Sequence, residues 1–76
     1  MPKAFIMIDV NTGRENEVQA VIKKLVGIKM VHGVTGGPDL IAFLDAEPYE
    51  EFAVVLSNIR QIPGVEDTNS CLVLEE

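Results

Sequence analysis

Two adjacent glycines and an aspartate lie in a short polar segment, residues 34–40, between two apolar runs. Glycine allows the backbone to adopt positive φ and leaves its amide groups uncovered, so Gly36 and Gly37 can approach another chain or a ligand closely. Pro38 and Asp39 are ordinary turn residues, and one interpretation is a hairpin turn in which the aspartate accepts local N–H groups. The other interpretation is a binding loop, because backbone N–H groups beside a fixed carboxylate suit a zwitterion such as a free amino acid.

The chain has one histidine and one cysteine, His32 and Cys71. A single cysteine excludes an intrachain disulfide, and one residue of each type cannot form a zinc site of the usual Cys/His kind within one chain. The sequence places no serine, cysteine or acid to make His32 catalytic, and we interpret it as a surface residue on an edge strand. We expect Cys71 to be a small buried strand residue. The sequence therefore predicts neither an enzyme nor a site for a metal or another cofactor.

The length of 76 residues predicts a single domain over residues 1–76. A domain of this size buries only about 60% of its unfolded surface, so oligomerisation is the expected source of further burial. The net charge of −6, from 6 basic and 12 acidic residues, opposes binding to phosphate groups, and we expect no direct contact with nucleic acid. The N-terminal apolar segment is too short and too acidic for a signal peptide or a membrane span, which favours a cytoplasmic protein without membrane contact.

The first part of the chain predicts a strand followed by a helix. Residues 4–10 are apolar on both faces over most of their length, which is typical of a central strand. Thr12 and Glu15 have the spacing of a capping box, so we expect a helix to begin near Arg14 and to end at Gly27. The helix should bury one apolar stripe, which is formed by Val18, Val21, Ile22, Leu25 and Val26.

The rest of the chain predicts three strands and a second helix. Residues 28–35 have a weaker apolar pattern, which favours an edge strand, whereas residues 40–46 are apolar on both faces and predict a second central strand. Pro48 suits the first turn of a helix, where its missing N–H costs nothing. Residues 65–74 form the last strand, polar at first and apolar later. The second helix should bury Tyr49, Phe52, Val55, Leu56 and Ile59.

This β-α-β-β-α-β order predicts an α+β fold of the ferredoxin-like type, a four-stranded antiparallel sheet with two helices on one face. The other face of the sheet is then uncovered. If Ile6, Ile8, Leu40 and Leu44 face the helices, the uncovered face carries an apolar patch formed by Phe5, Met7, Ile41 and Phe43. Because a patch of this size is unusual on a monomer, we expect a homodimer in which two sheets meet face to face.

Three segments together carry a resemblance to a known family. Residues 34–40 read V-x-G-x-x-D-L, residues 64–70 read G-V-x-x-T-x-S, and Gly27 and Ile28 stand between the first helix and the second strand. The order and spacing of these segments resemble the effector-binding domain of the Lrp/AsnC transcriptional regulators, the RAM (regulation of amino acid metabolism) domain. The resemblance covers nearly the whole chain, and that family's domain has the same β-α-β-β-α-β order.

The resemblance implies an amino-acid effector that binds where dimers meet in a higher oligomer. Ser70 replaces a threonine of the family pattern and keeps the hydroxyl, whereas Pro38 fills a position that is often aromatic. The family's helix-turn-helix domain has no counterpart in this chain. We therefore expect a stand-alone module that regulates amino-acid metabolism or transcription without binding DNA, with a full-length Lrp/AsnC regulator as a candidate partner. Carried over position by position, the ligand-binding residues are Gly36, Gly37, Asp39, Leu40, Thr68 and Ser70.

Three other functions remain open at this point. The same fold also occurs in small dimeric barrel enzymes of the monooxygenase or isomerase kind, which would need a cavity on the open sheet face lined by His32. The ACT-type regulatory domains bind amino acids through the turn after the first strand, which here is residues 9–13. A structural assembly module without any ligand is the third.

Overall fold

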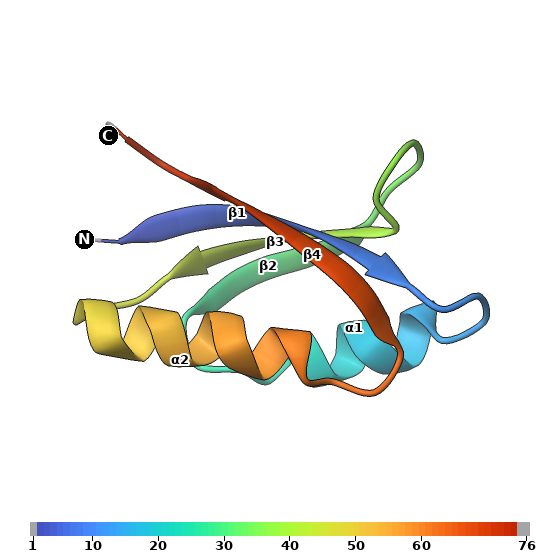
Figure 1. The fold of residues 1–76 in the computed structure, drawn as a ribbon, viewed down its shortest axis with the longest axis horizontal. Coiled ribbons are helices and arrows are strands. Elements are labelled where there is room, and N and C mark those ends of the chain that lie inside the picture. Colours follow the sequence, from blue (N-terminus) through green and yellow to red (C-terminus); the bar gives the residue numbers. More distant parts are fainter. Residues whose placement is uncertain (1, 75–76) are drawn as a thin grey trace.

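A four-stranded antiparallel sheet carries both helices on one of its faces (Figure 1). The computed structural model describes residues 2–74. Across the sheet the strand order is β2-β3-β1-β4, so β1 and β3 are central and β2 and β4 are the edges. The predicted ferredoxin-like fold, with its two central strands, is confirmed. Its elements are β1 (Lys3–Val10), α1 (Glu15–Lys23), β2 (Ile28–Gly33), β3 (Leu40–Asp45), α2 (Tyr49–Arg60) and β4 (Val65–Leu72).

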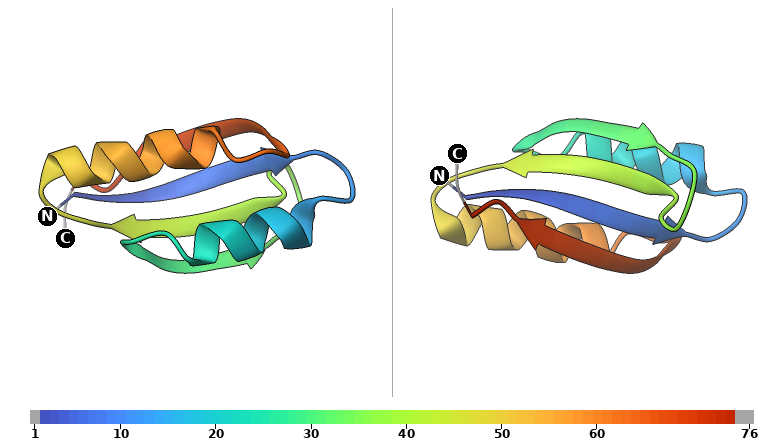
Figure 2. Two further views of the ribbon diagram at one scale, coloured as in Figure 1. Left: turned by 90° about the horizontal axis from the view of Figure 1, so that it is seen from below. Right: turned by 90° about the horizontal axis from the view of Figure 1, so that it is seen from above.

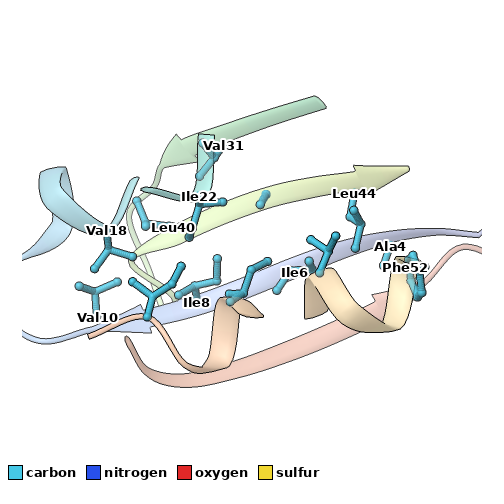
Figure 3. Close-up of a cluster of buried hydrophobic side chains, with 14 residues drawn as sticks. Ala4, Ile6, Ile8, Val10, Val18, Ile22, Val31, Leu40, Leu44 and Phe52 are labelled. Carbon is cyan, nitrogen blue, oxygen red and sulfur yellow. The ribbon is translucent and has the colours of Figure 1, made fainter. Parts of the chain in front are cut away.

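Strict alternation along the two central strands builds the core between the sheet and the helices. In β1 the side chains of Ile6 and Ile8 are fully buried, while Phe5 between Ala4 and Ile6 is 45% exposed. No polar or charged side chain of residues 2–74 is buried, so the fold depends on the removal of apolar surface from water. The helices complete this core, which Figure 3 shows, with Val18 and Ile22 of α1 and Phe52, Val55 and Ile59 of α2.

The opposite face of the sheet is uncovered, as the right-hand view of Figure 2 shows. The strand register places Phe5 opposite Phe43 and Met7 opposite Ile41, and the two phenyl ring centroids lie 4.8 Å apart. The predicted apolar patch on the open face is therefore confirmed. Cys71 lies opposite Phe5 on this same face and is exposed, so the prediction of a buried cysteine was wrong.

Helix α1 begins where the sequence predicts, but the predicted capping box does not form. Arg14 is the N-cap residue, and no side chain caps the first turn. The carboxylate of Glu15 instead accepts a hydrogen bond from the backbone N–H of Gly13 at 3.0 Å. Gly13 has a φ of 89°, and the chain turns there, so the N-cap lies two residues beyond Thr12, at Arg14.

Helix α1 also ends earlier than predicted, at Lys23 rather than at Gly27. The N–H groups of Lys24 and Leu25 bond to carbonyls three residues back, a tighter spacing that closes the last turn. The buried stripe is also narrower than predicted, because Val21 and Val26 are exposed. In α2 the side chain of Tyr49, predicted to be buried, is also exposed. Neither helix of residues 2–74 has the length and apolar character needed to cross a membrane.

Candidate functional site

The glycine turn joins the edge strand β2 to the central strand β3. It rises on the side of the sheet opposite to the helices (Figure 1). A backbone hydrogen bond of 3.1 Å from Val34 N to Asp39 O closes the turn. Gly36 has a φ of 107°, which favours glycine, whereas Gly37 does not adopt positive φ. A Cβ atom at either glycine would meet no atom within 4 Å, so both face open space that a ligand or a second chain can approach.

Asp39 fastens the turn to the end of β1. Its Oδ2 accepts a hydrogen bond of 2.8 Å from the backbone N–H of Val10, and its own N–H donates to Ile8 O at 3.0 Å. The aspartate thus has the capping role that the simple hairpin interpretation assigns to it. Within residues 2–74 its second oxygen, Oδ1, has no hydrogen-bond partner and can accept one from a ligand.

The two hydroxyls of β4 lie on one face of the sheet. Register pairs Thr68 with Ile8 and Ser70 with Ile6, so both side chains are on the helix-covered face rather than on the open face. The Thr68 hydroxyl accepts a hydrogen bond of 3.2 Å from Nε of Arg60 at the end of α2. The start of β4 therefore presents hydroxyls on one face and other polar groups on the opposite one.

The open face has a hollow of about 450 Å³ where the turn meets the start of β4. This hollow brings two of the six predicted ligand-binding residues, Gly37 and Thr68, together within one chain, but the Thr68 hydroxyl lies on the other face of the sheet. Asp9 and Asp67, which sequence analysis did not single out, face each other directly across the β1–β4 ladder. The complete lining is Met7, Asp9, Gly37, Pro38, Asp67, Thr68 and Asn69.

A second hollow, of about 730 Å³, lies on the other side of the turn, against helix α1. It contains Asp39 and Leu40, whereas Gly36 and Ser70 line neither of these two hollows. The side chain of Leu40 is only 1% exposed, so this residue can offer a ligand only its backbone. The predicted set is therefore split between two sides of the turn. The lining of the second hollow is Glu15, Asn16, Gln19, Gly33, Val34, Thr35, Asp39 and Leu40.

The two arginines of the chain have different surroundings. Arg14 forms an exposed ion pair with Glu17 one turn along α1. The hydrogen bond between them, and then their opposite charges, lower the pKa of the Glu17 carboxyl and raise the pKa of Arg14. Among the described residues Arg60 makes no ion pair, and its hydrogen-bond partner is the Thr68 hydroxyl. Sequence analysis missed Arg60, although the short connection between α2 and β4 indicates that it lies near the start of β4.

Comparison with known proteins identifies the family. The model of the Lrp/AsnC ligand binding domain matches residues 3–76. The chain belongs to this family. The resemblance predicted from the turn and the last strand is therefore confirmed, and this Lrp/AsnC domain spans almost the whole sequence.

Three relatives illustrate the match. The HTH-type transcriptional regulator FL11 of Pyrococcus horikoshii is 35% identical over 72 residues, which are 95% of this chain and 48% of FL11, so the Lrp/AsnC domain spans about half of that relative. The crystal structure of TTHA0845 from Thermus thermophilus is 30% identical, with a TM-score of 0.93 over 100% of this chain and 96% of that one. The L-Met complex of the transcriptional regulator NMB0573 from Neisseria meningitidis is 24% identical, with a TM-score of 0.82 over 99% of this chain and 51% of that one, and shows the shared fold.

Proposed function

We propose that this Lrp/AsnC domain binds an amino-acid effector, assembles as a dimer and higher oligomer, and regulates amino-acid metabolism or transcription without itself contacting DNA. The observation that carries the proposal is the glycine turn, whose two uncovered glycines face open space beside a hollow, in a chain of a ligand-binding domain family. Two relatives support it, because FL11 is named a transcriptional regulator and NMB0573 forms a complex with L-methionine. A full-length Lrp/AsnC regulator is the partner that we propose for DNA contact.

The proposed site lies between dimers, where the glycine turn of one dimer meets the hydroxyls of β4 from another, because within one chain these hydroxyls lie on the helix-covered face and the turn rises on the opposite side. The uncovered backbone of Gly36 and Gly37 and the hydroxyls of Thr68 and Ser70 would bind the ligand carboxylate. Oδ1 of Asp39 would accept the ammonium group, while Oδ2 stays on Val10 N. Leu40 would contribute through its backbone alone, since its side chain belongs to the core.

Replacement of Asp39 with asparagine separates its two roles. Asparagine keeps an oxygen for the N–H of Val10 but removes the charge. We expect at least one amino acid to bind the wild type below millimolar concentration, and Asp39→Asn to weaken that binding by about tenfold to a hundredfold, the range for a hydrogen bond to a charged group. Calorimetry with each of the twenty amino acids measures both.

Asp39→Ala is the matched variant, because it removes the charge and the contact with Val10 N together. We expect it to bind as weakly as Asp39→Asn and also to unfold at a lower temperature. If Asp39→Asn binds the amino acid as tightly as the wild type does, the charge of Asp39 does not contribute to binding, and its role is only to cap the N–H of Val10. If no amino acid binds the wild type below millimolar concentration, the proposed effector site is wrong.

The enzyme alternative requires a cavity on the open sheet face that is lined by His32. His32 is exposed on edge strand β2, as predicted, and its pairing with Ile41 places it on the open face of the sheet. The hollow that it lines extends to Gln19 and Lys23 of α1. The hollow on the open face does not include it. Within residues 2–74 no group of three or more histidine, cysteine, aspartate or glutamate side chains is placed to hold a metal. We therefore place the proposed site at the glycine turn rather than at His32.

The charge of the chain predicts that it does not bind duplex DNA on its own. Binding to phosphates needs clustered lysine and arginine side chains, and the net charge here is −6. We expect no shift of a duplex in a gel at physiological salt, with or without amino acids. A sequence-specific shift by the purified chain would contradict this part of the proposal.

A further inference from the structure

Strand β4 forms one outer edge of the sheet, as the right-hand view of Figure 2 shows. The backbone N–H of Val73 donates to Lys3 O at 2.9 Å, which fixes the hydrogen-bond pattern of the β1–β4 ladder. Hydrogen-bonded and non-hydrogen-bonded pairs alternate in an antiparallel ladder. The backbone groups of Thr68, Ser70 and Leu72 therefore point away from β1, out of the sheet.

Other parts of the two sheet edges are blocked. In the middle of β2, the Gln19 side chain donates a hydrogen bond of 3.0 Å to Val31 O, and a register shift interrupts the first part of this strand. At the start of β4, Oδ1 of Asp67 accepts the outward N–H of Thr68 at 2.9 Å. Devices of this kind keep edge strands from pairing with other chains.

The end of β4 carries no such device among the described residues. Within residues 2–74 the outward N–H and C=O groups of Ser70 and Leu72 have no hydrogen-bond partner. Leu72 is 56% exposed and Leu74 is 94% exposed, and residues 68–74 carry no charge. An uncharged, apolar edge with unpaired backbone groups is a template for a further strand.

A second copy of this chain is the partner that fits this edge. The net charge of −6 makes two copies repel each other, and the uncharged end of β4 adds nothing to that repulsion. Because the block on β2 lies in the middle of that strand, the end of β4 is the stretch of edge that can pair without interruption. Antiparallel pairing about a two-fold axis is self-complementary, and it would place Leu72 opposite the partner's Leu72.

We infer that the end of β4 is a docking edge for a second copy, where β4 of one dimer pairs antiparallel with β4 of another and joins two sheets into one. The inference rests on the proposed higher oligomer and assigns a contact to it. Leu72 does not lie on the open face, so this contact is separate from the proposed face-to-face dimer. The hydroxyls of Thr68 and Ser70 project from the helix-covered face, so backbone pairing at the edge does not use them.

Two opposite charges at position 72 test this contact. Leu72→Lys and Leu72→Glu each place two like charges opposite one another across the two-fold axis. Each variant alone should remain a dimer at concentrations where the wild type forms a higher oligomer, with association between dimers weakened at least about tenfold. An equimolar mixture of the two variants should regain the higher oligomer, because the charges that face each other are then opposite. Native mass spectrometry measures the number of subunits and shows whether the regained species contains both variants.

Val54→Lys is the matched control, because it places lysine at a similarly exposed apolar position on α2, away from the β4 edge. It should assemble as the wild type does, and circular dichroism should show all three variants folded. If either variant at position 72 keeps the wild-type distribution of subunits, or if the mixture does not regain the higher oligomer, the β4 edges do not pair and the effector proposal stands without this contact. If the wild type forms nothing larger than a dimer, with or without amino acids, this contact and the proposed higher oligomer are both wrong, and calorimetry still decides whether an effector binds.

Discussion

Replacement of Phe43 with aspartate should break the proposed dimer into folded monomers. Phe43 packs against Phe5 on the open sheet face, with the two rings tilted by 49° and their centroids 4.8 Å apart. In a dimer formed by two such faces an aspartate at this position would be buried without a partner. An uncompensated buried charge costs about 3 to 5 kcal/mol, which weakens the dimer by roughly a hundredfold to several thousandfold.

Sedimentation at micromolar concentration measures this change directly. Val54→Asp is the matched control, because it places the same side chain at an exposed apolar position on α2, outside the sheet face. We expect Val54→Asp to remain a dimer and both variants to keep the circular dichroism of the wild type. If the wild-type protein sediments as a folded monomer, the proposed dimer is wrong.

The second large effect is expected at Gly27, which joins α1 to β2 with a φ of 90°. A Cβ atom at this position would lie 2.9 Å from Cβ of Ala46 and 3.0 Å from Cδ1 of Leu44. Neither neighbour can move easily, because the N–H of Asp45 bonds to Gly27 O at 2.9 Å and holds the two segments together. We expect Gly27→Ala to lower the free energy of unfolding by about 2 to 4 kcal/mol, from backbone strain and crowding together.

Gly13→Ala measures the cost of backbone strain without the cost of crowding. Gly13 has nearly the same φ, 89°, but a Cβ atom there would meet nothing within 4 Å. We expect this variant to lose only about 1 to 2 kcal/mol, the cost of a left-handed conformation. In thermal unfolding at one fixed protein concentration, the melting temperature of Gly27→Ala should therefore be well below that of Gly13→Ala. Equal melting temperatures would show that contact with Ala46 and Leu44 carries no cost.

The sequence predicts the layers of this fold well because β1 and β3 have unambiguous patterns. Their apolar residues alternate between two faces, and the only economical arrangement buries one face under two amphipathic helices. The ends of α1 were predicted less well. Thr12 has the spacing of a cap, but the chain turns at Gly13 and Arg14 becomes the N-cap residue, so the capping box does not form. Tyr49 has helical spacing yet lies in the first turn of α2, where the helix extends past the core.

The candidate site shows a different limit. The turn was recognised because glycine, proline and aspartate specify it locally. Which side chains of β4 lie on which face of the sheet could not be predicted, because the first half of this strand is polar on both faces. Only pairing with β1 shows that Thr68 and Ser70 lie on the helix-covered face and that Asp67 and Asn69 lie on the open one. That pairing shifts register at Asp9 and Val10, which a pattern of alternating residues cannot predict.

Native mass spectrometry with and without a mixture of the twenty amino acids tests the central proposal most directly, because it reports bound mass and the number of subunits together. An effector bound between dimers must favour the assembled state in proportion to its preference for it. We predict a dimer as the smallest species, a higher oligomer whose share rises with the mixture, and a bound mass equal to that of one or a few amino acids per site. A distribution of subunits that the mixture leaves unchanged, without any bound amino acid, would contradict the proposed function.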